Sequence, residues 1–518
     1  MAAESKSPCH HPSNIENVDL QNLRWVLQGN VAVLTGNPFD PVVQDQYDKV
    51  ASVVDEDCIW LGPGLQLLLD HVLAVSQEGK IVWLAPARDS QSVLQSAQQL
   101  QNCHFIRLES TLEFLCPGMI DLHIHAPQFS YTGTATDLPL TGPDGWLETY
   151  TFPAERRLKN NLPLARRVYQ CVVQTTLENG TTTAVYFGTL HLKPNQILVD
   201  VCLEYGQRAL VGKVCMDRNA PHDYVQTLEE NIEETRELIH YIEHHPQNSN
   251  PLVLPLITPR FIPTCSPELL TALGDIAAEH PNCHITSHIS ESIDEVAWSK
   301  HLDEQDHGIM DRTDAAMFHS HKLLTDRCIM AHGVHLSDAD ADILMEQGTA
   351  VAHCPLSNFF FAGGVFPCRR MMQRGNKVGL GTDVAGGYSP SMLQAARTTV
   401  VASQSLQAMH TQMEQQPTTN DTTESILDYR HAFYLATLGG AEALGLQHQI
   451  GNLQVGMSFD AFILSAKGKS NITVFPDFDS LADVFQKLLV LGDDRNISHV
   501  FVKGREVKRQ FQVTSCSP

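Results

Sequence analysis

The 518-residue chain is 43% hydrophobic and 18% charged, so it can bury a large core in a barrel-sized domain with a smaller domain beside it. Its 35 basic and 59 acidic residues give a formal net charge of −24. This charge argues against a nucleic acid or an anionic membrane as partner, because both are bound through clustered Lys and Arg. The 13 thinly spread cysteines, the polar N-terminus and the lack of a long apolar run predict a reduced, cytosolic protein.

Short β-like runs occur at both ends of the chain. Residues 1–21 are expected to form a polar tail. Residues 22–115 contain short apolar runs separated by turns, with one helical pattern from Asp89 to Gln101; the runs predicted as strands are NVAVLTG, CIWLGPG, KIVWLAP, CHFIRLES and TLEFLCPG. Similar runs return in residues 451–518, around Phe459 and His499. Because neither end has a continuous pattern of its own, we expect one small β-sandwich domain formed from both chain ends.

The middle of the chain, residues 116–450, alternates apolar β-rich runs with amphipathic helical segments, for example from Leu164 to Glu178, Thr227 to His244 and Pro267 to His280. This alternation predicts a (β/α)8 barrel of the TIM type, and unbroken apolar runs are typical of strands buried on both faces. The eight β-rich runs are 119–125, 181–187, 209–216, 252–258, 283–289, 328–334, 349–354 and 377–383.

Two polar, turn-rich segments stand out. Residues 130–145 follow the first run, where the active-site loops of such barrels lie, and residues 415–423 are expected to form an exposed loop between helices. The tract Cys9-His10-His11 contains metal-binding residue types, but a cluster of this kind in a tail is usually incidental.

The first β-rich run has the sequence Asp121-Leu-His123-Ile-His125. Side chains alternate along a strand, so His123 and His125 face the same side, into the barrel. Two inward imidazoles without partners are costly to bury, whereas together they can bind one metal ion. The alternative is a hydrogen-bonded polar pair in the core.

Three further motifs place polar side chains at the C-terminal ends of predicted strands, where barrel active sites form. His288 ends the fifth run, and Glu291 just after it is a candidate proton shuttle, or a residue favoured at a helix N-terminus. His332 ends the sixth run and suits either a metal ligand or a hydrogen-bond partner of a bound water. Asp383 ends the eighth run and suits both a metal ligand and a base.

The combination of His123, His125, His288 and Asp383 therefore predicts a metal site, with His332 beside it. Imidazole nitrogens and a carboxylate oxygen, with one position left for water, favour Zn²⁺. Mn²⁺ or Fe²⁺ tolerates the same ligands.

These motifs make the sequence similar to the amidohydrolase superfamily, in its branch with one catalytic metal, and within that branch to the guanine deaminase family. The resemblance covers residues 115–462 and the flanking β domain. TPRF and GTDVAGGYS are more specific than the general superfamily motifs. The motifs that carry the resemblance include PGMIDLHIHAPQFS (117–130), TFPAERR (151–157), TPRF (258–261), SHISE (287–291), MAHG (330–333) and GLGTDVAGGYS (379–389).

The resemblance implies hydrolytic deamination of guanine to xanthine and ammonia, with one Zn²⁺ per subunit, in a homodimer. It implies four zinc ligands: His123, His125, His288 and Asp383. It also implies that Asp383 accepts a proton from the zinc-bound water, that Glu291 protonates the purine, and that His332 stabilises the oxyanion or orients the water. The residues that the resemblance places against the purine are His125, Gln128, Arg260, Phe261, His288, Glu291 and Asp383. The planar guanidinium of Arg260 also suits this role by its own chemistry, because it can bind a carbonyl oxygen and a ring nitrogen together.

Two alternative functions stay open. The segment 139–146 looks longer than usual for the family, Leu356 stands where a polar residue is more usual, and residues 359–361 are all Phe. These departures allow a deaminase of another amino-heterocycle, such as 8-oxoguanine, a pterin or an s-triazine. The other alternative is a non-catalytic scaffold, against which the complete set of ligands and proton-transfer residues argues.

Overall fold

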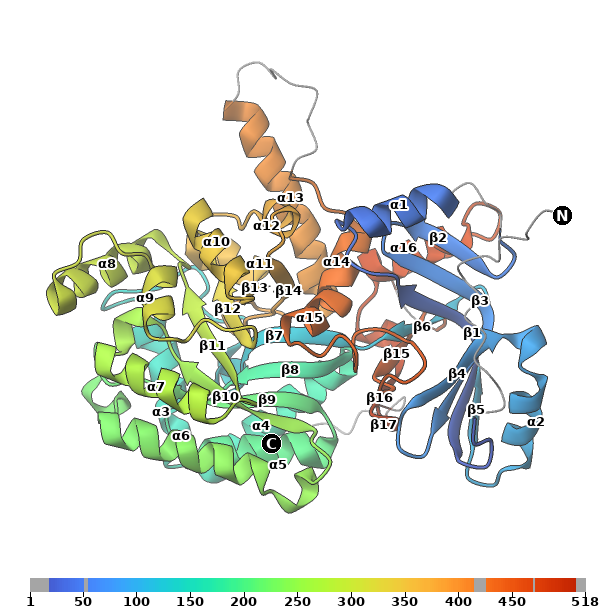
Figure 1. The fold of residues 1–518 in the computed structure, drawn as a ribbon, viewed down its shortest axis with the longest axis horizontal. Coiled ribbons are helices and arrows are strands. Elements are labelled where there is room, and N and C mark those ends of the chain that lie inside the picture. The colour runs from blue at the N-terminus through green and yellow to red at the C-terminus, as the bar shows by residue number, and fades with distance from the viewer. Residues whose placement is uncertain (1–17, 51–54, 414–424, 469–470, 509–518) are drawn as a thin grey trace.

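The computed structural model describes residues 18–50, 55–413, 425–468 and 471–508. Figure 1 shows a barrel of cyan, green and yellow elements beside a β-sheet to which the blue N-terminal and the red C-terminal segments both contribute. The predicted fold class is thereby confirmed. The Cys9-His10-His11 tract and segment 415–423 lie outside the described residues. Among the described helices, none is long and apolar enough to cross a membrane.

Eight parallel strands form the barrel and follow one another in chain order. Nearly all their residues are buried, because the barrel core covers one face and the surrounding helices cover the other, which explains the unbroken apolar runs. Their bounds are β7 (Met119–His125), β8 (Thr181–Phe187), β9 (Arg208–Cys215), β10 (Val253–Pro259), β11 (His284–Ile289), β12 (Cys328–His332), β13 (Ala350–His353) and β14 (Lys377–Leu380).

The barrel closes between β7 and the segment that follows β14. β14 ends at Leu380, so Asp383 lies beyond the strand and not at its end, where the sequence had placed it. Past Leu380 the backbone turns toward β7. The N–H of Asp383 donates to the carbonyl oxygen of His123 at 2.8 Å, and the N–H of His125 donates to the carbonyl oxygen of Val384 at 2.9 Å. Backbone hydrogen bonds thus tie the first strand to the residues after the last one.

A buried carboxylate strengthens this closure. Asp121 accepts hydrogen bonds from the N–H and the hydroxyl of Thr382, at 3.0 and 2.5 Å, and from the N–H of His123 at 3.1 Å. Since the carboxylate lies on β7 and Thr382 lies next to Asp383, these bonds set the position of both segments relative to one another.

Helices between the strands cover the outside of the barrel (Figure 1). The three predicted helical segments form α4 (Leu162–Glu178), α6 (Leu228–Glu243) and α7 (Pro267–Glu279). Each begins after a polar cap: the side chains of Asn161, Thr227 and Ser266 accept backbone N–H groups of the first turn. The other helices from α3 to α15 are α3 (Phe152–Lys159), α5 (Leu192–Tyr205), α8 (Ile293–His307), α9 (Asp314–Ser320), α10 (Asp338–Glu346), α11 (Pro355–Ser357), α12 (Cys368–Gln373), α13 (Met392–Met413), α14 (Tyr429–Ala436) and α15 (Leu438–Ala443).

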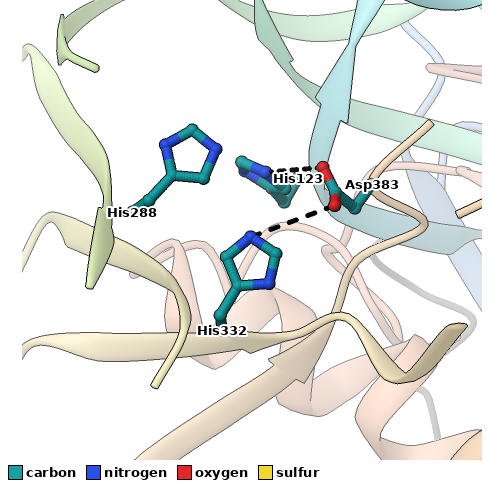
Figure 2. Close-up of side chains that lie close together, drawn as sticks. All are labelled: His123, His288, His332 and Asp383. Carbon is teal, nitrogen blue, oxygen red and sulfur yellow. Dashed lines mark ion pairs between the residues drawn. The ribbon is translucent and has the colours of Figure 1, made fainter. Parts of the chain in front are cut away.

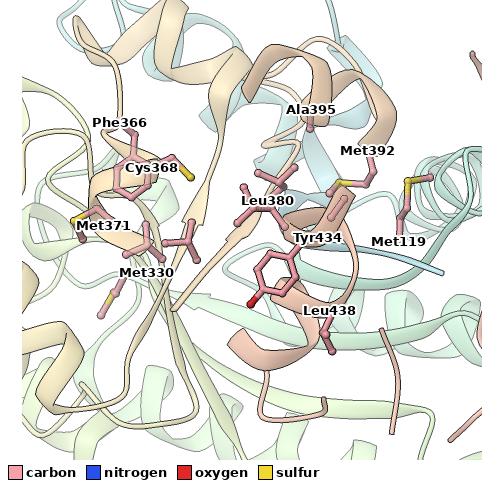
Figure 3. Packing of buried hydrophobic residues seen from close by; sticks show 14 of the residues in the cluster. Met119, Met330, Phe366, Cys368, Met371, Leu380, Met392, Ala395, Tyr434 and Leu438 are labelled. Atoms are coloured by element: carbon pink, nitrogen blue, oxygen red, sulfur yellow. The ribbon is translucent and has the colours of Figure 1, made fainter. Parts of the chain in front are cut away.

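A large buried cluster joins the last barrel strands to the helices over them (Figure 3). Met330 of β12 and Leu380 of β14 belong to the same cluster as Met371 of α12, Met392 of α13 and Tyr434 of α14. Closely packed buried side chains leave little room for strands to shift, so these contacts hold β12 and β14 in place.

The second part is a nine-stranded mixed sheet with the order β17-β16-β15-β6-β1-β3-β2, in which β4 pairs with β3 and β5 with β1. β6 joins the two chain ends, since it runs parallel to β1 and antiparallel to β15. Three helices accompany the sheet: α1 (Pro41–Val50), α2 (Gln91–Gln99) and α16 (Leu481–Leu491). The strands are β1 (Leu23–Leu34), β2 (Cys58–Gly62), β3 (Leu65–Ser76), β4 (Ile81–Pro86), β5 (His104–Arg107), β6 (Glu113–Pro117), β15 (Ala461–Ser465), β16 (Ile497–Val502) and β17 (Arg505–Lys508).

β3 is not among the strands predicted from the sequence, although this 12-residue strand pairs with three others. Its sequence, LQLLLDHVLAVS, is buried over most of its length and therefore lacks the alternation of apolar and polar residues that marks a half-exposed strand. A Leu-rich run of this kind fits a helix equally well.

Candidate active site

Five polar side chains, from β7, β11, β12 and the segment after β14, meet at the barrel mouth. His123 Nε2 lies 3.0 Å from Asp383 Oδ1. His125 Nε2 lies 3.1 Å from His288 Nε2 and 3.4 Å from Asp383 Oδ1. His332 Nε2 lies 3.9 Å from Asp383 Oδ2. Figure 2 shows His288, His332 and Asp383 gathered around His123. The structure thus brings together the four side chains predicted as ligands, with His332 at the same centre.

Several ring nitrogens in this cluster are buried without a hydrogen-bond partner. They are Nδ1 of His125, Nε2 of His332 and both ring nitrogens of His123, one of which faces the Asp383 carboxylate. A buried polar group left unpaired costs about 1–3 kcal/mol. Several unpaired nitrogens in one place are therefore stable only if a further group binds them. One ligand atom each of His123, His288, His332 and Asp383 lies within 4.8 Å of the others. The cluster is therefore capable of binding a metal ion.

Two of the imidazoles are oriented by hydrogen bonds that their Nδ1 atoms make outside the cluster. His288 Nδ1 donates to the carbonyl oxygen of Arg260 at 2.6 Å, and His332 Nδ1 donates to Asn358 Oδ1 at 2.9 Å. Because these oxygens only accept, the proton is on Nδ1 and the Nε2 lone pair of each ring is available at the centre. His332 and Asp383 both adopt left-handed backbone conformations, with φ of 72° and 48°, which non-glycine residues adopt mainly where the surroundings enforce it.

The charges of the cluster follow from burial and mutual contact. Burial lowers the pKa of His123, and burial together with neighbouring imidazoles holds the pKa values of His125 and His288 well below the ordinary value. Burial alone would raise the pKa of Asp383, but His123, His332 and His125 hold that pKa below its ordinary value. Neutral imidazoles and an ionised carboxylate are the forms that bind a metal ion.

Glu291 lies beside this cluster. Its Oε1 is 3.7 Å from His332 Nε2. Burial raises the pKa of the Glu291 carboxyl group, so this group holds a proton more readily than an exposed glutamate does. The geometry and the raised pKa both suit the predicted role of a proton shuttle.

Two buried carboxyl groups that the sequence analysis did not single out hold the loop that carries Glu291. Glu295 of α8 accepts the N–H of Glu291 at 2.7 Å. Asp314 of α9 accepts the N–H and the hydroxyl of Ser290, at 2.9 and 3.1 Å. Ser290 has φ of 46°, and these bonds stabilise that strained turn. In the sequence, the one indication that Glu295 contacts Glu291 was its position four residues further along the chain.

A cavity opens against the cluster, where the space not filled by atoms, including the part open to solvent, is about 550 Å³. Gln128, Arg260 and Phe261, three of the residues predicted to bind the purine, line it. The segment between β7 and α3, which looked long in the sequence, contributes to its wall. The other residues that line the cavity include His125, Leu140, Thr141, Trp146, Leu147, His288, Glu291, His332, Phe361 and Asp383.

Glu155 of α3 lies behind this wall and was also missed. It accepts hydrogen bonds from both Gln128 and Arg260. The guanidinium of Arg260 also lies over the ring of Phe152, 5.2 Å from its centroid. Phe152 and Glu155 both belong to the motif TFPAERR (151–157), and this motif was the feature of the sequence that could have pointed to them.

Comparison with known proteins agrees with this geometry. The model of the amidohydrolase family matches residues 114–507. The chain belongs to this family. It is 42% identical to the guanine deaminase of Homo sapiens over 453 residues, 86% of this chain and 94% of that protein. It is also 42% identical to the guanine deaminase of Dictyostelium discoideum over 396 residues, 76% and 83% of the two chains. The crystal structure of guanine deaminase from C. acetobutylicum with guanine bound in the active site matches with a TM-score of 0.76 at 26% identity, over 94% of this chain and 100% of that one. The resemblance found in the sequence is thus confirmed.

His288→Ala should deprive the amidohydrolase of its metal, because it removes one of the clustered ligand atoms. We expect elemental analysis after gel filtration to find metal in the wild type and little in this variant. His284→Ala is the matched control: His284 lies at the other end of β11, where its Nε2 donates to the carbonyl oxygen of Leu444 at 2.9 Å. Equal metal content in the two variants would contradict the site.

Proposed function

We propose that the chain hydrolyses guanine to xanthine and ammonia with one zinc ion per chain. The observation that carries the proposal is the position of a cavity lined by Arg260 and Gln128 directly against the His/Asp cluster and Glu291. The guanine deaminases that the chain resembles over most of its length support the same reaction. We also propose a homodimer, because two-fold dimers are the commonest assemblies of soluble oligomers.

The donor atoms of the cluster support zinc. Zn²⁺ is bound by imidazole nitrogens and carboxylate oxygens, and in catalytic sites it keeps one position for water. Bound there, zinc supplies a Lewis acid that lowers the pKa of a water molecule to about 7. Neutral imidazoles and the ionised Asp383 prepare the site for it.

The cavity wall suits a purine that carries a carbonyl group. Arg260 is buried, and with one nitrogen bonded to Glu155 its other N–H groups are available as donors. Guanine presents its O6 and N7 as adjacent acceptors, which a guanidinium binds together. The ring of Phe261 offers an apolar surface for the purine. Bound in this way, guanine would direct its amino-bearing C2 toward the cluster.

The side chains then divide the proton transfers. With Nδ1 of His332 protonated, its Nε2 accepts a hydrogen bond from the attacking water and orients it. Asp383 accepts the proton that the water loses as its oxygen bonds to C2. Glu291 gives a proton to a ring nitrogen and moves protons to the amino group, which leaves as ammonia. Guanine and water are thereby converted to xanthine and ammonia.

Ammonia release from a set of heterocycles tests the proposed reaction. Purified, zinc-loaded protein should turn over guanine far faster than 8-oxoguanine, adenine, cytosine or a pterin, and a chelator should abolish the activity. Faster turnover of another heterocycle would keep the chemistry and change the substrate. A metal-loaded protein that releases ammonia from none of them would contradict the proposal and favour a scaffold.

Glu291→Gln should separate proton transfer from metal binding. We expect kcat to fall by about 100-fold or more, since a glutamine cannot shuttle protons, while metal content and melting temperature stay near those of the wild type. Glu304→Gln, which changes an exposed glutamate on α8, is the control and should keep full activity. A kcat unchanged by Glu291→Gln would remove Glu291 from the mechanism.

A further inference from the structure

We propose that Glu155 is a positioning residue that sets the purine specificity of the cavity by fixing the hydrogen-bonding directions of Gln128 and Arg260. The inference rests on the proposed function, because it concerns how the same cavity recognises guanine. Glu155 does not itself line the cavity, whereas Gln128 and Arg260 do, so it acts through them.

Glu155 is completely buried on α3 and has three donors around its carboxylate. Gln128 Nε2 donates to Oε1 at 2.9 Å, Arg260 Nη1 donates to Oε2 at 2.9 Å, and the Tyr224 hydroxyl donates to Oε2 at 2.5 Å. The side chain of Arg260 is 4% exposed, so solvent screens this ion pair little. The three donors come from separate segments of the chain, and Glu155 links them.

The chemistry of a carboxylate decides how Gln128 is oriented. An ionised carboxylate only accepts hydrogen bonds, so the amide nitrogen of Gln128 must face Glu155. The amide oxygen then points away from Glu155, where the N–H of Ala385 approaches it at 3.4 Å. This contact is long and leaves the oxygen with acceptor capacity. Gln128 lines the cavity, and with its amide nitrogen held by Glu155 the group that it can offer a ligand is the amide oxygen, an acceptor. A neutral partner at position 155 would not enforce this orientation.

The same carboxylate fixes the donors of Arg260. The carboxylate holds Nη1, and Phe152 lies under the guanidinium plane. These two contacts restrict rotation of the guanidinium group, so its other N–H groups keep one direction. The cavity wall thus offers fixed donors and one fixed acceptor. A ring with a carbonyl oxygen beside an N–H, such as O6 and N1–H of guanine, satisfies both. A ring that lacks the carbonyl, such as 2-aminopurine, leaves the buried donors unpaired.

The test compares wild type and Glu155→Gln, both zinc-loaded, with three ligands: guanine as substrate, and hypoxanthine and 2-aminopurine as competitive inhibitors. Glutamine keeps the size of Glu155 and removes the charge that orders its partners. We expect the KM for guanine and the inhibition constant of hypoxanthine to rise about 30-fold, as expected for losing hydrogen bonds to a charged group. The inhibition constant of 2-aminopurine should change less than about three-fold, because 2-aminopurine has no carbonyl oxygen to accept those hydrogen bonds.

Tyr224→Phe is the matched control. It removes one hydrogen bond to the same carboxylate but leaves the contacts with Gln128 and Arg260. The ratio of the inhibition constant of hypoxanthine to that of 2-aminopurine should therefore stay close to the wild-type ratio. Glu155→Asp covers the case in which Glu155→Gln does not fold. It keeps the charge that Arg260 needs but is too short to reach both partners, so it should also raise the inhibition constant of hypoxanthine relative to that of 2-aminopurine.

Each outcome has a distinct meaning. If the wild type does not turn over guanine, the proposed function fails and this inference fails with it. If the wild type is active and the variants weaken hypoxanthine and 2-aminopurine equally, or weaken neither, Glu155 has only a structural role and the inference is overturned. Selective weakening of the carbonyl-bearing ligands, with unchanged metal content, supports it.

Discussion

The barrel closes through contacts between β7 and the segment after β14, and the geometry of the active site depends on that closure. The two histidines of β7 and the carboxylate of Asp383 come from opposite ends of the barrel sequence. Backbone hydrogen bonds between these segments, and the bonds from Asp121 to Thr382 and His123, bring them together. His288 and His332 then complete the centre from β11 and β12, which the packed core holds in place. The left-handed backbone at Asp383 is the strain that accompanies this arrangement.

Around this centre, the pKa values of two carboxyl groups are shifted in opposite directions because their neighbours differ. Facing imidazoles hold the pKa of Asp383 below its ordinary value, whereas burial raises the pKa of Glu291. Pairs of acidic groups whose surroundings shift their pKa values in opposite directions are typical of acid–base catalysis. The distinction between the two is not intrinsic to Asp or Glu. It follows from which elements of the barrel surround each side chain.

Much of this arrangement could be predicted from the sequence. Buried parallel strands appear as unbroken apolar runs, and His or Asp at the ends of several such runs indicates a shared centre. What could not be predicted depends on contacts between distant segments. Glu155 meets Arg260 across 105 residues, and Asp314 meets Ser290 across 24, so neither pairing has a local pattern. The strand β3 was missed for a different reason, since burial over most of its length removed the alternation that identifies strands.

The most direct test of this account is anomalous diffraction from crystals of the zinc-loaded protein, recorded above and below the zinc absorption edge. The account predicts one peak per chain at the barrel mouth, within bonding distance of His123, His288 and Asp383, with Glu291 outside that distance. His125 is the expected remaining imidazole ligand, because Nε2 of His332 accepts the hydrogen bond of the attacking water. A metal ion bound by His332 in place of His125 would contradict that role. A peak elsewhere, or none at the mouth of a metal-loaded and active protein, would contradict the account.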